Sequence, residues 1–198
     1  MDHLNWTLFF LINASSHANS LTVGIAGFFA IYAIWLAPLA LIAGWLRGDS
    51  ELRHLLVEAA LSTMVALLAA QIIGVAWPQP RPFMMGMGTN LMSHSPDSSF
   101  PSDHLTCLWG VAFSLLLHGR TRLLGLALAL LGIPMAWARI YLGVHFPLDI
   151  VGAGLVSALS AMAVAKVGRR PVAFLVIVAS LVHRQVFKPL IRRGWVVP

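Results

Sequence analysis

The sequence has few charged residues. They make up 10% of its 198 residues, while 59% are hydrophobic and the mean hydropathy is +0.82. Soluble domains carry about 25% charged residues, so a water-soluble domain is excluded and a single membrane-embedded domain over residues 1–198 is expected. Cysteine is equally scarce. The single Cys107 excludes an internal disulfide and indicates no cysteine-based metal site.

Basic residues are missing from the start of the chain. No Lys or Arg precedes Arg47, so the basic segment of a secretory signal peptide is not seen. The apolar stretch 4–12 is too short to span a bilayer and predicts a short N-terminal helix in the membrane interface. The only long polar stretch is 78–103, and a loop of this length in a compact protein is usually functional or disordered.

Long hydrophobic runs fill the rest and predict an all-α, polytopic membrane bundle of about six transmembrane helices. A crossing helix needs about 20 residues, which the run at 104–117 does not reach. The last run loses its apolar character at His183. For this run two alternatives stay open, a further span or a basic amphipathic tail in the interface. The predicted segments are 21–46, 55–77, 104–117, 123–141, 147–165 and 171 onward.

The net charge of +6 is expected to orient the chain rather than to bind nucleic acid. Basic residues gather in alternate loops, which the positive-inside rule places in the cytoplasm. Loops 78–103 and 142–146 then face outside. The cations of 184–198 fit this scheme poorly if the last segment crosses. The loop cations counted as cytoplasmic are Arg47, Arg53, Arg120, Arg122, Lys166, Arg169 and Arg170.

Three polar clusters share the outer face: Arg81-Pro82, residues 99–104, and 139–149. The planar guanidinium groups of Arg81 and Arg139 can each bind phosphate through two hydrogen bonds. A helix that starts at 101–104 offers free N–H groups to an anion, and Ser102 adds a hydroxyl donor. The clusters therefore predict a phosphate site.

The same clusters contain two histidines and a carboxylate. Because His145 and Asp149 are four residues apart at a helix start, the carboxylate can hold one ring nitrogen and leave the other free to attack. His104 remains to protonate a leaving oxygen and to activate water. Asp103 has two open interpretations, a helix cap or a contact to His104 or the substrate. His94 and Asp97 are expected to be solvated, with substrate contact as the alternative.

These residues resemble the signatures of the type 2 phosphatidic acid phosphatase superfamily: Lys-x6-Arg-Pro, Pro-Ser-Gly-His and Ser-Arg-x5-His-x3-Asp. Arg81-Pro82, Pro101-Ser102-x-His104 and Arg139-x5-His145-x3-Asp149 match in order and spacing. The resemblance implies a phosphohistidine on the nucleophile His145, with His104 as acid and base. It also implies that Arg81, Ser102 and Arg139 hold the phosphate, without a metal or cofactor.

The chain departs from the signatures at three positions. Gly74 replaces the Lys, Asp103 the Gly, and Ala138 the Ser. Gln71 is a neutral candidate for the role of the missing Lys. The pattern is most similar to the bacitracin-resistance type of undecaprenyl-pyrophosphate phosphatase, which recycles the cell-wall lipid carrier at the outer face of a bacterial inner membrane. That implies a polyprenyl pyrophosphate as substrate, beside membrane lipids, and leaves the oligomeric state open.

Three alternatives remain open. The chain could act on phosphatidylglycerol phosphate or phosphatidic acid, or it could transfer phosphate to lipid A, because no motif residue reads the lipid tail. A non-catalytic phospholipid-binding or transport protein would use the same cations. The pairing of His145 with Asp149 argues against that class, since binding needs charge and not an oriented nucleophile.

Overall fold

The computed structural model describes residues 2–197, and no strand occurs among them. The predicted all-α architecture is confirmed. The α-helices α1–α9 and the 3-10 helices η1 and η2 follow in the order α1 (Asp2–Ile12), α2 (Ser20–Ile31), η1 (Ala33–Trp35), α3 (Leu36–Arg47), α4 (Ser50–Ala76), η2 (Pro82–Met85), α5 (Asp103–Leu116), α6 (Arg122–Tyr141), α7 (Pro147–Val167), α8 (Arg169–Val186) and α9 (Lys188–Arg192).

Four helical stretches in this part of the chain are long and apolar enough to cross a membrane: Ser20–Arg47, which joins α2, η1 and α3, and the helices α4, α6 and α7. The chain is therefore an integral membrane protein. Two of these stretches begin at a side-chain cap. Asn19 accepts a hydrogen bond from the Leu21 N–H, and Asp49 accepts one from the Leu52 N–H, which satisfies N–H groups that lack a partner within the helix.

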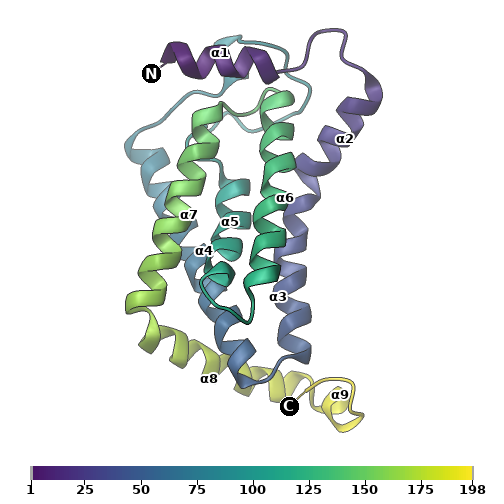
Figure 1. Ribbon diagram of the computed structural model, residues 1–198, viewed down its shortest axis with the longest axis vertical. Helices are drawn as coiled ribbons and strands as arrows, with labels where there is room; N and C mark the ends of the chain where they lie inside the picture. Colours follow the sequence, from purple (N-terminus) through teal and green to yellow (C-terminus); the bar gives the residue numbers. More distant parts are fainter. Residues whose placement is uncertain (1, 198) are drawn as a thin grey trace.

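The helix α5 is short, as its hydrophobic run predicted, with 14 residues. It packs against α4, α6 and α7 and begins below the upper ends of α6 and α7 (Figure 1). Its neighbours separate it from lipid, so it does not need the length of a full span. Small residues of α7 permit close packing. At Gly152 an added Cβ would lie 2.3 Å from the ring of Phe100.

The helix α8 lies across the lower end of the bundle instead of along it (Figure 1). This orientation fits the amphipathic-tail alternative, and it places the tail cations at the end where the other basic loops lie. Buried groups fix it there. His183 accepts a hydrogen bond from Trp45 Nε1 at 3.1 Å, and its Nε2 lies 3.2 Å from Arg53 Nη2.

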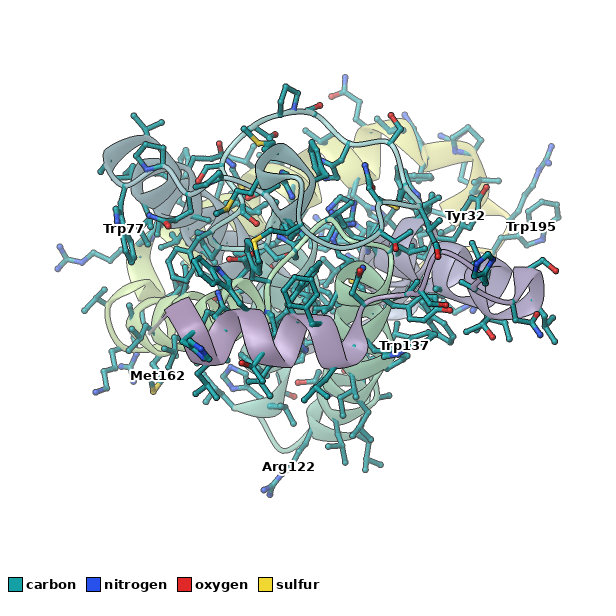
Figure 2. The ribbon with its side chains drawn as sticks, turned by 90° about the horizontal axis from the view of Figure 1, so that it is seen from above. Tyr32, Trp77, Arg122, Trp137, Met162 and Trp195 are labelled. Carbon is teal, nitrogen blue, oxygen red and sulfur yellow. The ribbon has the colours of Figure 1, made fainter. Side chains whose placement is uncertain are left out.

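The loops alternate between the two ends of the bundle, as the charge pattern predicted. At the lower end, Arg120 bonds both Asp49 and Glu51 at 2.8 Å and so joins the α5–α6 loop to the α3–α4 turn. At the upper end, α1 lies across the bundle (Figures 1 and 2). The exposed aromatic side chains of Tyr32 and Trp77 lie on the periphery (Figure 2).

Candidate active site

The loop between η2 and α5 is tied to the α6–α7 turn, and this brings the polar clusters together. Asn13 Nδ2 donates to the carbonyls of Thr89 and Tyr141 at 3.0 and 3.1 Å, and its Oδ1 accepts from the Thr89 N–H at 2.7 Å. Gly143, in the turn between α6 and α7, lies against Thr89 of this loop and has a φ of +82°. A Cβ there would lie 2.3 Å from the Thr89 carbonyl oxygen, so glycine is required for conformation and for space.

His145 and Asp149 form the pair that their spacing predicted. The Nδ1 of His145 lies 3.2 Å from Oδ2 of Asp149. The same carboxylate accepts from the Phe146 N–H at 2.7 Å and from the Ser99 hydroxyl. With the carboxylate fixed by these donors, Nδ1 carries the proton, and Nε2 keeps a free lone pair. Ser99 lies in the cluster 99–104, but its bond to Asp149 was not predicted from the sequence.

Three donors surround Nε2 of His145, the side chain of which is 1% exposed. Arg81 Nη1 and Ser102 Oγ each lie 3.2 Å from Nε2, and Arg139 Nη2 lies 3.3 Å from it. One lone pair cannot satisfy three donors. The surplus suits an anion with several oxygens, and a phosphate placed against Nε2 would supply them.

Arg81 is held by its own loop. Asp97 Oδ1 accepts from Nε and Nη2 at 2.8 Å, and the carbonyls of Val144 and Ser98 accept at 3.0 and 3.2 Å. Asp97 is exposed to solvent as expected, but it is also the ionic partner of Arg81. Sequence spacing could not predict this pairing, because the two residues lie in a loop without periodicity.

Arg139 is fully buried. Its Nη1 donates to the Ala30 carbonyl at 3.2 Å, and its Nη2 lies 3.0 Å from His94 Nε2. Its Nε has no hydrogen-bond partner within the described residues. His94 thus reaches the site, where sequence reasoning expected a solvated side chain. The only feature of the sequence that could have suggested this position is the short distance along the chain from His94 to the cluster 99–104.

His104 lies in the first turn of α5, two residues after Ser102, and is partly buried. Asp103 is not a helix cap. Ser102 holds the N-cap position, and the Asp103 carboxylate accepts from Gln71 Nε2 at 3.1 Å. Gln71 is thereby engaged outside the cluster around His145. Within residues 2–197, no group of three His, Cys, Asp or Glu side chains is arranged to hold a metal.

Burial and positive charge keep both loop histidines neutral. Burial, then the charges of Arg139 and Arg81, hold the pKa of His145 well below its usual range. Burial, followed by the charge of Arg81, also lowers the pKa of His94. A neutral His145 is the form that can attack phosphorus.

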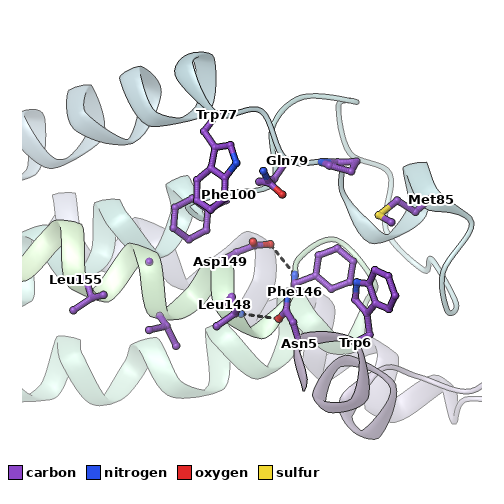
Figure 3. Close-up of a pocket in the computed structure, with 13 residues that line it drawn as sticks. Asn5, Trp6, Trp77, Gln79, Met85, Phe100, Phe146, Leu148, Asp149 and Leu155 are labelled. Atoms are coloured by element: carbon purple, nitrogen blue, oxygen red, sulfur yellow. Dashed lines mark hydrogen bonds between the residues drawn. The ribbon is translucent and has the colours of Figure 1, made fainter. Parts of the chain in front are cut away.

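An apolar cavity of about 600 Å³ adjoins the site on the side of Asp149 (Figure 3). Four aromatic rings contribute to its lining, and Asn5 of α1 lies at one side, where it accepts the Leu148 N–H at 3.0 Å (Figure 3). Val151 and Leu155, on the exposed face of α7, open it toward the surroundings of the bundle. The aromatic lining residues are Trp6, Trp77, Phe100 and Phe146.

Several known proteins are similar to this chain. YbjG of Escherichia coli (strain K12) is 37% identical over 164 residues, covering 81% of this chain and 82% of its own. Undecaprenyl-diphosphatase BcrC of Bacillus subtilis (strain 168) is 32% identical over 154 residues, 78% of this chain and 79% of its own. The crystal structure of Aquifex aeolicus LpxE has a TM-score of 0.68 at 27% identity, covering 82% of this chain and 95% of that one.

The match to a family is broader than any one motif. It extends over residues 55–173, which is more than half of the chain, from within α4 to the start of α8, and includes the loops that carry Arg81, Ser102 and His145. By this match the chain belongs to the PAP2 superfamily.

Proposed function

We propose that the protein is a membrane phosphatase that hydrolyses undecaprenyl pyrophosphate to undecaprenyl phosphate and inorganic phosphate. The observation that carries this is the environment of His145, where Asp149 holds Nδ1 and three phosphate-binding donors face Nε2. The name of BcrC, a relative over 78% of this chain, supports the lipid. The product would return to use as a carrier for cell-wall glycans.

The reaction takes place in two steps. In the first, the Nε2 lone pair of His145 forms a bond to the terminal phosphorus, and the bond from that phosphorus to the bridging oxygen breaks. Arg81, Arg139 and Ser102 stabilise the negative charge on the non-bridging oxygens. The negative substrate favours protonated His104, which gives its proton to the departing lipid phosphate.

In the second step, His104 takes a proton from water as the water oxygen attacks phosphorus. The P–N bond breaks, and inorganic phosphate leaves with His145 restored. Asp149 keeps the imidazole in one tautomer through both steps, since its carboxylate is itself fixed by Ser99 and the Phe146 N–H.

The test is phosphate release by the purified protein in detergent from undecaprenyl pyrophosphate, phosphatidic acid and phosphatidylglycerol phosphate at matched concentrations. The first should be hydrolysed fastest. His145→Ala should abolish turnover, while His104→Ala should lower kcat by about 10²- to 10⁴-fold. Faster hydrolysis of another lipid would replace the substrate. Near-normal turnover by His145→Ala would falsify the phosphohistidine mechanism, and no release from any lipid would overturn the enzyme class.

We further propose that the protein lies in a bacterial inner membrane with this site on the outer side. The support is the charge distribution, because the basic loops lie at the end of the bundle away from His145.

A further inference from the structure

His94 is a histidine at the phosphate site that the mechanism above does not use. It lies in the loop between η2 and α5, and its side chain is 17% exposed. Its ring meets that of His145 edge to face, with centroids 6.2 Å apart. The Leu91 N–H donates to the Leu142 carbonyl at 3.0 Å, so the preceding residues hold His94 against the α6–α7 turn.

The hydrogen bonds of His94 show which nitrogen faces the site. Nδ1 lies 3.2 Å from the Ser95 carbonyl oxygen, which can only accept, so Nδ1 carries the proton. Nε2 then accepts from Arg139 Nη2 at 3.0 Å. In this state the imidazole occupies one N–H of Arg139 that a phosphate oxygen could take.

A bound phosphate changes what Nε2 can do. When a phosphate oxygen accepts the Arg139 hydrogen, the lone pair of Nε2 faces an anion and is repelled unless it gains a proton. The charged groups around His94 set this balance. The charges of Arg81 and Arg139 oppose the protonation of His94, and the Asp97 carboxylate, 3.9 Å from Nδ1, favours it. The rings of His145 and His104 are the other titratable groups near His94.

The family signature has one more cation than this chain. Gly74 stands at the position of the signature Lys, and Gln71, one turn earlier, is bonded to Asp103. Two arginines therefore face a substrate that carries several negative charges. His94 is the remaining side chain in the loop that contacts a phosphate-binding arginine and can become a cation.

We propose that His94 is a substrate-binding residue that takes over the role of the signature Lys: it gains a proton as the pyrophosphate binds, and Nε2–H donates to a phosphate oxygen. The proton comes from water, and no covalent bond changes. This inference rests on the proposed function. His94 is then a cation while substrate is bound and is neutral while the site is empty.

The test compares wild type with His94→Gln and His94→Ala. A hydrogen bond to a charged group contributes about 10- to 100-fold to binding, so both variants should raise KM for undecaprenyl pyrophosphate by that factor with a smaller change in kcat. The KM of wild type should rise as pH increases from the pKa of His94 in the empty site to its higher pKa with substrate bound, and should level off above that. The KM of His94→Gln should lack that rise. His17→Ala, a histidine outside the site, is the matched control and should leave KM unchanged.

Proton uptake is the direct measurement. Binding of methylenediphosphonate, a non-hydrolysable pyrophosphate analogue, is followed by calorimetry in two buffers of different ionisation enthalpy. Wild type should take up more protons per bound ligand than His94→Gln. In addition, Gly74→Lys should restore part of the lost affinity in the His94→Ala background.

The outcomes separate the two proposals. If wild type releases no phosphate from the lipid, the proposed function fails. If wild type is active and His94→Gln matches it in KM, pH profile and proton uptake, the inference is overturned. His94 then has only a structural role, in which its hydrogen bond holds the loop next to Arg139. The Tm of each variant in detergent identifies a folding defect. His94→Asn serves as the second variant if His94→Gln does not fold.

Discussion

Among the single residues around His145, the proposed phosphate site has more hydrogen-bond donors than acceptors. Arg81, Ser102 and Arg139 all direct donors at one nitrogen, and the buried Nε of Arg139 has no partner among the described residues. A buried donor left without an acceptor costs about 1–3 kcal/mol. In the proposed function, a bound phosphate would relieve this cost by supplying acceptors, which is why the arrangement favours an anion.

Gly74 gives a test of how the site balances charge. A Cβ at this position would lie 3.4 Å from Ser98 Cβ, so Gly74→Lys is accommodated beside the loop that holds Arg81. The added cation should tighten the binding of inorganic phosphate and slow its release. We expect kcat to fall by about 2- to 10-fold and the Ki of phosphate to fall with it.

Steady-state kinetics with phosphate as product inhibitor measures both constants, and Arg139→Ala is the comparison. That variant should reduce kcat/KM by about 10²-fold or more, because it removes donors that face the reacting phosphorus. A many-fold faster Gly74→Lys beside a nearly silent Arg139→Ala would mean that the assignment of the phosphate site is wrong.

Spacing in the sequence predicted some of these residues and not others. His145 and Asp149 could be paired because four residues at a helix start fix their separation. Asp97 and His94 could not be assigned, since the path of an irregular loop depends on distant contacts such as Asn13 with Thr89. For the same reason the environment of Arg139 was open until the loop was placed beside it.

At the scale of elements, α1 connects the loop to the bundle. Asn13, at its end, bonds Thr89 and Tyr141. Asn13→Ala would remove the side-chain partner of the partly buried N–H and carbonyl of Thr89, at about 1–3 kcal/mol, while the Tyr141 carbonyl keeps its bond from the Ala14 N–H. We expect a lower Tm in detergent together with a higher KM. Asn90→Ala, which removes only an exposed bond to the Met92 N–H, should change neither. Equal Tm values for the two variants would contradict the anchoring role.

The apolar cavity beside Asp149 gives a second prediction for α1. Trp6 lines this cavity (Figure 3), whereas Leu11 on the same helix is exposed and does not line it. If the lipid chain lies there, Trp6→Ala should raise KM for undecaprenyl pyrophosphate by about 5- to 100-fold, the equivalent of about 1–3 kcal/mol of apolar contact.

The same change should have little effect on a short-chain pyrophosphate, and Leu11→Ala should affect neither substrate. Parallel KM measurements with the long and the short substrate check this. An equal loss on both would show that Trp6 supports the phosphate site and not the lipid chain.

The bounds of α6 were well predicted, whereas the start of α4 lies five residues before the predicted segment 55–77 and the orientation of α8 was left open. The fourth predicted run, 123–141, agrees with α6 (Arg122–Tyr141) within one residue, because hydrophobic length alone decides it. The direction of α8 was left open, since an amphipathic sequence allows several placements. The buried contact of His183 with Trp45 and Arg53 decides it, and such a contact cannot be predicted from periodicity.

At the scale of the whole molecule, the two ends of the bundle differ in charge and in chemistry. This predicts the orientation in the membrane. Ser95 and Ser50 are both exposed, the first in the loop of the site and the second at the start of α4 at the opposite end. In a Cys107→Ser background, Ser95→Cys should react with an impermeant thiol reagent in intact spheroplasts. Ser50→Cys should react only after lysis. The reverse pattern would place the site in the cytoplasm.

The position of the site at one end of the bundle has a consequence for the lipid itself. In the proposed reaction, the pyrophosphate and the monophosphate share a single chain, which would stay in the bilayer while the headgroup reacts next to His145. Hydrolysis at this end would therefore leave the carrier in the leaflet from which it came. If new glycan units are attached on the other side, a separate transporter must move the dephosphorylated carrier across the bilayer, and its rate can limit the cycle however fast the phosphatase is.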